Sequence, residues 1–354
     1  MSLAARIADR IRTGGPISVA EYMHLCLHDP ADGYYATRPA LGSEGDFITA
    51  PLVSQMFGEL IGLWMVELWR QMGRPTPFRL VELGPGDGTL MADLHRAARL
   101  EPGFPEAAET WLVEPSRPFR DLQRQRLGPG PIHADRLEEV PPGAPLLLVG
   151  NEVLDCLPAR QWEWRGGAWK ERRIGLEGDR LVFGLAPAPQ VRFAADAPWE
   201  GAVLEHSAAQ EALGSEIGAR IAADGGAALL IDYGRAQAGL GDTLQALRGH
   251  VREDPLAHPG QADLTVHADF PTMLAAARRE GIETAGPVAQ GRFLDALGLR
   301  ARAAALTRTA GPGEAARLER QVARLTAADQ MGELFLAAAL HSPGLQPPGF
   351  GAPP

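Results

Sequence analysis

A glycine-rich segment in the second quarter of the chain, LVELGPGDGT at residues 80–89, constrains the fold most. Two apolar residues lead into an acid, three glycines then alternate with other residues, and a helix-forming run, 90–100, follows. Glycine has no Cβ and reaches positive φ without steric penalty, so the backbone can come close to a ligand here. The helix start that follows leaves N–H groups unpaired. The pattern predicts a strand, a tight turn and a helix that bind a nucleotide-like cofactor through Glu82, Gly84, Pro85, Gly86 and Gly88.

The spacing of the three glycines distinguishes between cofactors. Dinucleotide-binding turns carry G-x-G-x-x-G, whose third glycine would fall at Thr89 in this chain. The glycines instead follow E-x-G-x-G-x-G, the form typical of class I methyltransferases that use S-adenosyl-L-methionine (SAM). SAM carries no phosphate and its sulfonium is positive, which suits nearby acids. A plain strand-to-helix turn is the alternative that the motif alone leaves open, whereas Thr89 disfavours a dehydrogenase.

Length and composition narrow the class of protein further. The chain has 354 residues, 45% of them hydrophobic, which is enough for one large domain with additions or for two domains. Its formal net charge of −10 argues against general nucleic-acid binding, which needs a basic surface. The two cysteines predict no disulfide framework, and the scattered histidines predict no metal site. No apolar run is long enough to span a membrane and no signal core opens the chain, so we expect a cytoplasmic bacterial protein.

Strands and helices alternate through the middle of the chain. Helical patterns separate the apolar strand patterns, which lie at 80–83, 110–113, 132–133, 145–149 and 227–231. Such alternation predicts a parallel sheet with helices on both faces. We therefore expect an α/β fold built on a Rossmann-like class I methyltransferase sheet, with an N-terminal helical extension and a closing strand at 334–340.

The carboxyl ends of the predicted strands carry polar residues. Ligands of parallel sheets sit beyond these ends, and the rule collects Glu82, Glu114, Asp135, Asn151 and Glu152 on one edge. Glu114 is placed to accept hydrogen bonds from both ribose hydroxyls, and Asp135 could accept one from the adenine amino group. A helix N-cap, or a first-turn acid favoured by the helix dipole, is the alternative for both residues.

The N-terminal part combines helices with an irregular loop. Helical patterns cover 1–28, where Ser18 and Glu21 form a capping box, and 52–72. Prolines, glycines and aspartates break any regular element between residues 29 and 51. We expect an ordered loop near the site, acting as a lid; a surface loop packed by its own aromatics is the alternative. Its substrate-facing candidates are Tyr35, Asp46, Phe47 and Thr49.

Other segments are assigned from composition. Tryptophans and apolar residues alternate over 160–195, which predicts antiparallel hairpins inserted after the fourth strand. Residues 235–266 are polar and loop-rich and predict another cover for the site. The resulting division is a covering unit at 1–77, a SAM-binding domain at 78–341 with an insertion at about 160–200, and a disordered, proline-rich tail at 342–354.

The segment after the fourth strand, NEVLDCLP at 151–158, holds the catalytic candidates. Methyl transfer is an in-line displacement that needs alignment of nitrogen, methyl and sulfur more than acid–base strength. A guanidinium has five N–H donors and no acceptor, so carboxylates and carbonyls should build its site. Glu152 and Asp155 are three apart and would share one face of a helical turn, where they grip a guanidinium while Asn151 orients it.

Several longer motifs that follow one another in a fixed order resemble the MidA/NDUFAF7 family. The match spans about residues 16–340, nearly the whole chain. Its motifs are DPADGYY at 29–35, GDFITAP at 45–51, FGE at 57–59, VELGPG at 81–86, NEVLDCLP at 151–158, ERR at 171–173, DYG at 232–234 and MGELF at 331–335.

This resemblance implies a class I SAM-dependent protein arginine methyltransferase. The family's mitochondrial member symmetrically dimethylates an arginine of a respiratory complex I subunit and supports complex I assembly, which implies a protein partner of that kind. Two residues depart from the family pattern: Leu52 stands where an acid is usual, and Asp87 where a basic residue is usual. Two alternatives remain, namely methylation of a small molecule and an assembly chaperone that binds SAM without essential catalysis.

Overall fold

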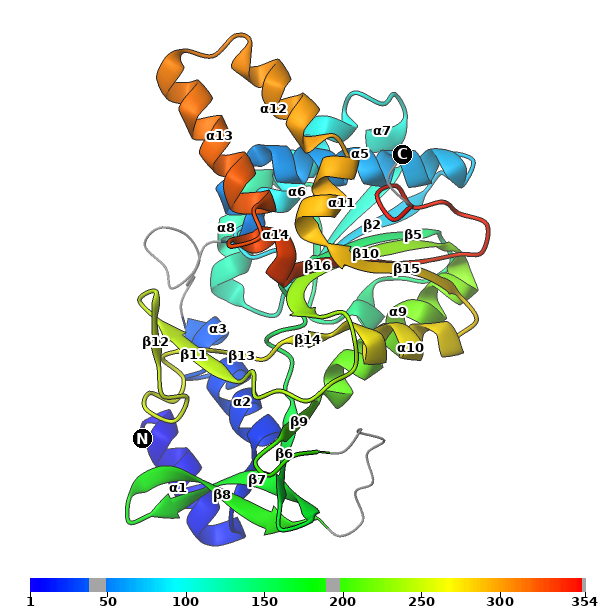
Figure 1. Cartoon of the computed structure of the whole chain (residues 1–354). Helices are drawn as coiled ribbons and strands as arrows, with labels where there is room; N and C mark the ends of the chain where they lie inside the picture. Colours follow the sequence, from blue (N-terminus) through cyan, green and yellow to red (C-terminus); the bar gives the residue numbers. More distant parts are fainter. Residues whose placement is uncertain (38–48, 189–197, 352–354) are drawn as a thin grey trace.

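An eight-stranded sheet organises the larger lobe of the protein (Figure 1). The computed structural model describes residues 1–37, 49–188 and 198–351. The strands of this sheet are β2 (Phe78–Leu83), β3 (Ala108–Val113), β4 (Ile132–Ala134), β5 (Leu146–Asn151), β10 (Gly226–Arg235), β14 (Ala268–Asp269), β15 (Glu283–Ala289) and β16 (Phe335–His341). Their order is β15-β16-β10-β5-β2-β3-β4, with β14 paired to β10. Within this order, β10, β5, β2, β3 and β4 are parallel to one another. Strand β16 runs antiparallel to both of its neighbours, β10 and β15.

Helices cover both faces of this sheet, as the sequence predicts. On β5, Leu147 and Val149 pack into the core on one face, while Leu146 and Leu148 pack into the core on the other. A strand buried on both faces reads as a continuous apolar run, which explains why the alternation of strands and helices could be recognised. The first core contains α5 (Gln55–Gln71), α6 (Thr89–Ala98), α7 (Phe104–Ala107), α11 (Gln290–Ala296) and α13 (Pro312–Thr326); the second contains α9 (Ala208–Asp224) and α10 (Phe270–Arg279).

The larger lobe also contains α4 (Ala50–Val53), which packs on α5, and the helices and 3₁₀ turn described next. Helix α12 and α13 project from it as a hairpin, seen at the top of Figure 1. Helix α8 follows β3, and the 3₁₀ turn follows β4. Their bounds are α8 (Arg117–Leu127), η1 (Leu137–Glu139), α12 (Leu299–Thr307) and α14 (Met331–Leu334).

The N-terminal helices and the inserted hairpins form a second, smaller lobe. It holds α1 (Leu3–Gly14), α2 (Val19–His28), β1 (Ile17–Ser18), β6 (Arg160–Arg165), β7 (Ala168–Glu177), β8 (Arg180–Pro187) and β9 (Val203–His206). Ile17 of β1 pairs with Ile174 of β7, and both are buried in one core with Tyr22. The predicted capping box of Ser18 and Glu21 starts α2. The boundary at residue 77 therefore does not separate the lobes, because α5 packs on the large sheet while α1 and α2 pack on the hairpins.

The segment 235–266, expected to be loop-rich, contains a small antiparallel sheet of the second lobe. Its strands are β11 (Gln245–Arg248), β12 (Val251–Glu253) and β13 (Asp263–Thr265). Ala246 and Leu264 pair across it and are buried in the same core as Tyr22. Strands of three or four residues are too short to show an alternating pattern, which is why the sequence did not reveal them.

The C-terminal tail packs on the larger lobe as far as residue 351, so the expectation of disorder is wrong for 342–351. Trp64 Nε1 donates a hydrogen bond to the Pro348 carbonyl at 3.1 Å. The ring of Phe350 lies 5.1 Å from that of Phe293, centroid to centroid, and Leu345 is buried. Proline content pointed to disorder, but these apolar side chains hold the segment against α5 and α11.

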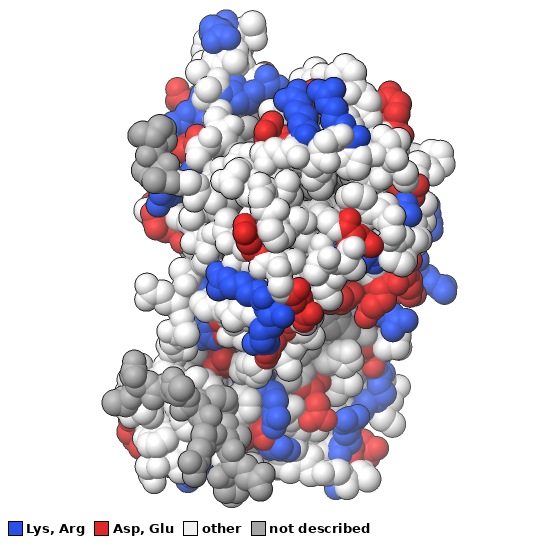
Figure 2. All heavy atoms as spheres, turned by 90° about the vertical axis from the view of Figure 1, so that its right-hand side faces the viewer, with Lys and Arg blue, Asp and Glu red and all other residues white. Residues whose placement is uncertain are grey.

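Three properties of the described residues concern membrane spans, metal-binding groups and surface charge. In the part of the chain that the structure describes, no helix combines the length and the apolar character needed to cross a membrane. Over the same residues, no group of three His, Cys, Asp or Glu side chains is arranged to hold a metal ion. Figure 2 shows basic and acidic side chains interspersed on the face that it presents.

Candidate active site

The glycine-rich turn lies between β2 and α6, where the sequence predicts it. Gly84 and Gly86 adopt φ angles of 57° and 53°, and Gly88 precedes α6 at 81°. A Cβ on Gly84 would meet Val153 Cγ1 at 2.8 Å, because the turn packs against the residues that follow β5. The turn thus requires glycine for its conformation, and at Gly84 for space as well.

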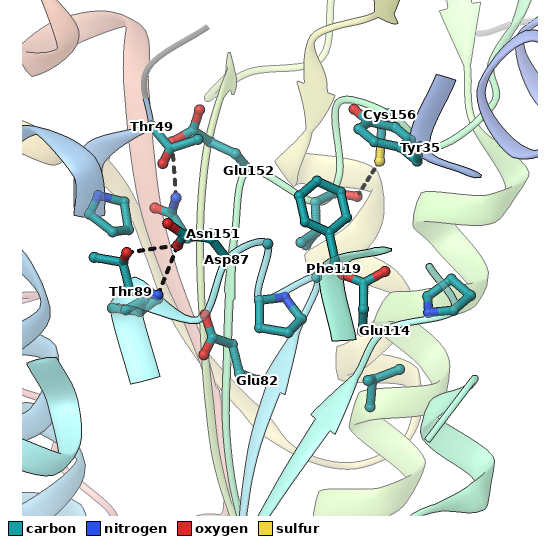
Figure 3. Close-up of a pocket in the computed structure, with 18 of the residues that line it drawn as sticks. Tyr35, Thr49, Glu82, Asp87, Thr89, Glu114, Phe119, Asn151, Glu152 and Cys156 are labelled. Carbon is teal, nitrogen blue, oxygen red and sulfur yellow. Dashed lines mark hydrogen bonds between the residues drawn. The ribbon is translucent and has the colours of Figure 1, made fainter. Parts of the chain in front are cut away.

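A cavity of about 270 Å³ opens beside this turn, at the carboxyl ends of β2, β3 and β5 (Figure 3). Glu82 lies below the turn in this view, Glu114 and Phe119 lie on one side, and Asn151 and Glu152 on the other. This is the edge where parallel sheets bind ligands. The cavity therefore brings together most of the residues that the strand-end rule selected.

Glu82 is the most deeply buried acid that lines the cavity. Its side chain is 2% exposed, and Oε2 has no hydrogen-bond partner among the described residues. Burial raises the pKa of Glu82 to about 8, and the neighbouring Asp87 and Glu114 carboxylates act in the same direction. A buried acceptor without a partner fits a ligand that brings N–H donors, as the methionine amino group of SAM does.

Glu114 stands at the end of β3, on the opposite wall. Its Oε1 accepts a hydrogen bond from the Ser116 backbone N–H at 2.8 Å. Burial raises the pKa of Glu114 to about 7, although this N–H and the Arg120 guanidinium oppose the rise. A partly desolvated carboxylate at this strand end is suited to accept the ribose hydroxyls of SAM.

Asp87 and Leu52, the two departures from the family pattern, both line the cavity. Asp87 Oδ1 accepts hydrogen bonds from Thr89 N at 3.0 Å and Thr89 Oγ1 at 2.7 Å. Its Oδ2 forms an ion pair with Arg126 at 2.7 Å. The acid therefore stabilises the first turn of α6 instead of leaving an unpaired charge beside the cofactor site.

Asp135 does not reach the cavity. Its side chain is 62% exposed and pairs with Arg120 at the surface. Its backbone N–H donates to Glu139 Oε2 at 2.8 Å, within the turn that follows β4. Asp135 is therefore not among the residues that line the cavity, and its contact with the adenine amino group stays a prediction.

Asn151 and Glu152 lie together on the wall opposite Glu114. Asn151 Nδ2 donates to Glu152 Oε1 at 2.9 Å, and the Ala50 backbone N–H donates to the same oxygen at 3.2 Å. Asn151 Oδ1, which is buried, and Glu152 Oε2 make no hydrogen bond with the described residues. Burial raises the pKa of Glu152 to about 8, and Asp155 contributes to the rise. The wall thus offers two acceptor atoms that no described residue engages.

Asp155 is buried behind this wall and does not line the cavity. Glu152 has a φ of 57°, so residues 152–155 do not form the helical turn that would place both acids on one face. Burial raises the pKa of Asp155 to about 6, and a hydrogen bond from Tyr233 opposes this rise. The structure therefore does not bring Glu152 and Asp155 together in the cavity, as the prediction of a shared guanidinium site requires. The neighbours Asn151 and Glu152 lie there instead.

The smaller lobe closes the cavity from the other side. Tyr35, in α3 (Tyr34–Thr37), lines it and donates its hydroxyl to Asp263 Oδ1 at 2.9 Å. Thr49, just before α4 (Ala50–Val53), lines it from the larger lobe, because Ala50 is buried in the same core as α5. The other two lid candidates, Asp46 and Phe47, lie outside the described residues.

His28, Phe119 and Cys156 are among the cavity residues that were not selected from the sequence. His28 ends α2, and burial, together with His24, lowers its pKa to about 4, so the imidazole is neutral at physiological pH. Phe119 comes from the first turn of α8, and Cys156 donates to the Val153 carbonyl at 3.4 Å. No local pattern marks His28 or Phe119, whereas Cys156 lies within the segment 151–158 already singled out.

Comparison with known families places the site in context. Residues 60–288, which include the glycine-rich turn and the wall at 151–152, match a family described as S-adenosyl-L-methionine-dependent methyltransferases. A crystallised protein from Burkholderia thailandensis, bound to S-adenosyl-homocysteine, has a similar structure with a TM-score of 0.83 and 27% identity. The alignment covers 99% of this chain and 92% of that one.

Curated relatives are similar over most of the sequence. The protein arginine methyltransferase NDUFAF7 homolog of Drosophila melanogaster is 36% identical, covering 97% of this chain and 85% of the relative. The human protein arginine methyltransferase NDUFAF7 is 33% identical, covering 83% of this chain and 72% of the relative. Both carry mitochondrial names, so the expectation of a cytoplasmic bacterial protein is contradicted by this comparison.

Proposed function

The chain belongs to this family of SAM-dependent methyltransferases, and from that premise we propose that it methylates an arginine side chain of a protein. The observation that carries the proposal is a pair of acceptors on one wall, Asn151 Oδ1 and Glu152 Oε2, for which the described residues supply no hydrogen-bond donor. A planar cation with several N–H donors satisfies both atoms. The curated relatives, which are named protein arginine methyltransferases, support the same acceptor.

The opposite part of the cavity would hold SAM. Glu82 below the glycine-rich turn would receive the amino group, Glu114 the ribose hydroxyls, and the backbone of Gly84, Pro85 and Gly86 would line the methionine portion. The buried Oε2 of Glu82, which has no hydrogen-bond partner among the described residues, fits such a ligand. When bound, SAM supplies an electrophilic methyl group on its sulfonium.

Asn151 and Glu152 would orient the acceptor nitrogen. Asn151 Nδ2 donates to Glu152 Oε1, which fixes the amide and leaves its buried oxygen without a partner among the described residues. Glu152 Oε2 would accept an N–H from the guanidinium beside it. A guanidinium remains cationic after methylation, so its nitrogen must lose one proton; Glu152, with a pKa of about 8, is a stronger base than an ordinary glutamate.

The protein acceptor that we propose is a subunit of respiratory complex I, with a role for the methylation in complex I assembly. The support is the NDUFAF7 name of the curated relatives, together with the motif resemblance that spans the chain. Methylation of a small molecule has no feature of the site in its favour. The wall carries acceptors for a multiply donating cation, which a protein arginine provides.

The test compares methylated arginines in a deletion strain, in the same strain complemented with the wild type, and in one complemented with Glu152→Gln. We expect one or a few dimethylated arginine peptides to disappear on deletion and to return only with the wild type. Peptides from a complex I subunit would support the finer proposal. An unchanged set of methylated arginines, with a methylated metabolite lost instead, would contradict protein arginine methylation.

A further inference from the structure

Asp232 is a fully buried carboxylate beside the cavity wall. The hydrogen bonds that its side chain accepts from the described residues all come from backbone N–H groups. Asp232 lies on β10, one residue past Ile231, the last residue of β10 paired with β5. Its Oδ2 accepts hydrogen bonds from Leu154 N at 2.7 Å and Asp155 N at 3.2 Å. Its Oδ1 accepts one from Tyr233 N at 2.8 Å. The Asp232 carboxylate therefore accepts backbone N–H groups of the segment after β5, just beyond the point where the pairing of β10 with β5 ends.

The segment that Asp232 holds has an unusual conformation. Glu152 adopts a φ of 57°, in the left-handed region that residues with a Cβ seldom occupy. Such strain persists only where the surroundings fix the backbone on both sides. On the N-terminal side, Glu152 N donates to the Ile231 carbonyl at 2.8 Å; on the C-terminal side, Asp232 fixes Leu154 and Asp155.

We propose that Asp232 is a positioning residue for methyl transfer, holding residues 152–155 so that Asn151 and Glu152 present their acceptors to the substrate nitrogen. Without its carboxylate, two buried N–H groups lose their acceptor and the segment can relax toward an ordinary turn. Glu152 would then move relative to the methyl donor. Alignment governs this reaction, so the rate falls even though the cofactor wall stays intact.

This inference rests on the proposed function, and three variants separate the two. Asp232→Asn keeps one acceptor oxygen and adds an N–H₂ group, so it cannot accept from Tyr233 N and from the Leu154 and Asp155 donors at once. Glu152→Gln tests the acceptor wall itself. Glu205→Gln is the matched control, because Glu205 is also buried and accepts hydrogen bonds from Gln161 and Thr243, but lies in the smaller lobe and does not line the cavity.

The measurements are the rate of arginine methylation at saturating labelled SAM, with proteins of the deletion strain as acceptors, and the affinity for S-adenosyl-homocysteine by calorimetry. We expect Asp232→Asn to lower the rate at least tenfold and to leave that affinity within threefold. Glu205→Gln should leave both within twofold. A rate within twofold of wild type, or a parallel loss of S-adenosyl-homocysteine binding, would overturn the positioning role of Asp232.

Two further outcomes are distinguishable. Full activity of Glu152→Gln would contradict the proposed acceptor wall, whereas loss in Glu152→Gln with retention in Asp232→Asn would contradict the role of Asp232 alone. If Asp232→Asn does not fold, site-resolved hydrogen exchange on the wild type decides. The Leu154 and Asp155 amides should exchange as slowly as those of β5, and exchange at the rate of an open loop would overturn the inference.

Discussion

Asn151 Nδ2 donates a hydrogen bond to Glu152 Oε1 at 2.9 Å, so the two neighbours act as one unit on the cavity wall. The bond fixes the Asn151 amide and leaves its oxygen, like the second oxygen of Glu152, without a partner among the described residues. We therefore expect the wall to favour a ligand that donates several hydrogen bonds from one plane.

Glu152→Gln should lower kcat/KM by about 10²-fold, because a charged acceptor that orients the substrate is lost. The pH dependence gives a second check. Folding raises the pKa of Glu152 from 4.5 to about 8, and the ionised form binds the cation. In the wild type, kcat/KM should therefore rise with pH up to about 8 and then level off. Steady-state rates between pH 6 and 9.5 measure this rise of kcat/KM with pH. The rise should be absent in Glu152→Gln; if it is unchanged, the titrating group is another residue.

Glu114→Ala should weaken SAM binding about 10- to 100-fold, since a carboxylate that accepts two hydroxyls contributes on the order of 1.5–3 kcal/mol. Asp135→Ala is the matched control, because Asp135 is an exposed acid at the next strand end, paired with Arg120 and away from the cavity. Calorimetry with SAM measures both. We expect Asp135→Ala to stay within threefold of the wild type; equal losses in the two variants would mean that the cofactor reaches farther than the cavity does.

The strand-end residues illustrate what the sequence can predict. Glu82, Glu114 and Asn151 each follow an apolar run, and parallel strands bring such ends to one edge whatever the details of packing. Asp155 could not be placed in this way. The direction of the Asp155 side chain depends on the left-handed φ of Glu152 and on the hydrogen bond from Asp155 N to the buried Asp232. Both are properties of the folded turn.

The smaller lobe shows the other limit. Ile17 and Ile174 pair across more than 150 residues of sequence, and local patterns give no sign of this contact. The helical patterns at 1–28 and 52–72 correspond to α1, α2 and α5, whereas the short helix α3 and the start of α4 fall in the segment predicted to be irregular, and the boundary at residue 77 does not follow the two lobes. Tyr35 depends on the same long-range packing, because its hydroxyl partner Asp263 belongs to a strand too short to recognise.

Glu82→Gln should stabilise the ligand-free protein at high pH while weakening SAM binding. Folding raises the pKa of Glu82 from 4.5 to about 8, so the stability that this carboxyl contributes is present below pH 4.5 and is lost as pH rises through 8. Glutamine does not ionise. The gain in free energy of unfolding should therefore grow between pH 5 and pH 9, by about 3–5 kcal/mol. Denaturant unfolding at the two pH values measures it.

Glu101→Gln is the control for this prediction and should have the opposite sign. Arg70 hydrogen-bonds Glu101 and holds the pKa of its carboxyl below the usual value. Arg74 forms a second ion pair with the same carboxyl. Replacing Glu101 by glutamine should lower the free energy of unfolding at neutral pH. This loss should disappear as the pH falls through the range in which carboxyl groups titrate. A gain of stability in both variants would show that the amide itself stabilises, independent of ionisation at Glu82.

Tyr35→Phe should reduce both stability and methyl transfer. The substitution removes the hydroxyl that reaches Asp263 from the cavity side, at an expected loss of about 1–3 kcal/mol. Tyr22→Phe is the matched control, since Tyr22 donates to the Pro255 carbonyl at 2.7 Å in the same lobe but does not line the cavity. Thermal unfolding and methylation rates measure the pair. Both variants should be less stable, but only Tyr35→Phe should slow transfer severalfold; equal rates in the two would remove Tyr35 from the substrate wall.

The most direct test of the account incubates the purified protein with SAM carrying a deuterated methyl group and proteins of the deletion strain, and maps the label by mass spectrometry. The account predicts label on arginine nitrogens with the wild type and none above background with Glu152→Gln, while both bind S-adenosyl-homocysteine with similar affinity. Label on lysine, on a carboxylate or on a small molecule, or equal arginine labelling by the two proteins, would contradict it.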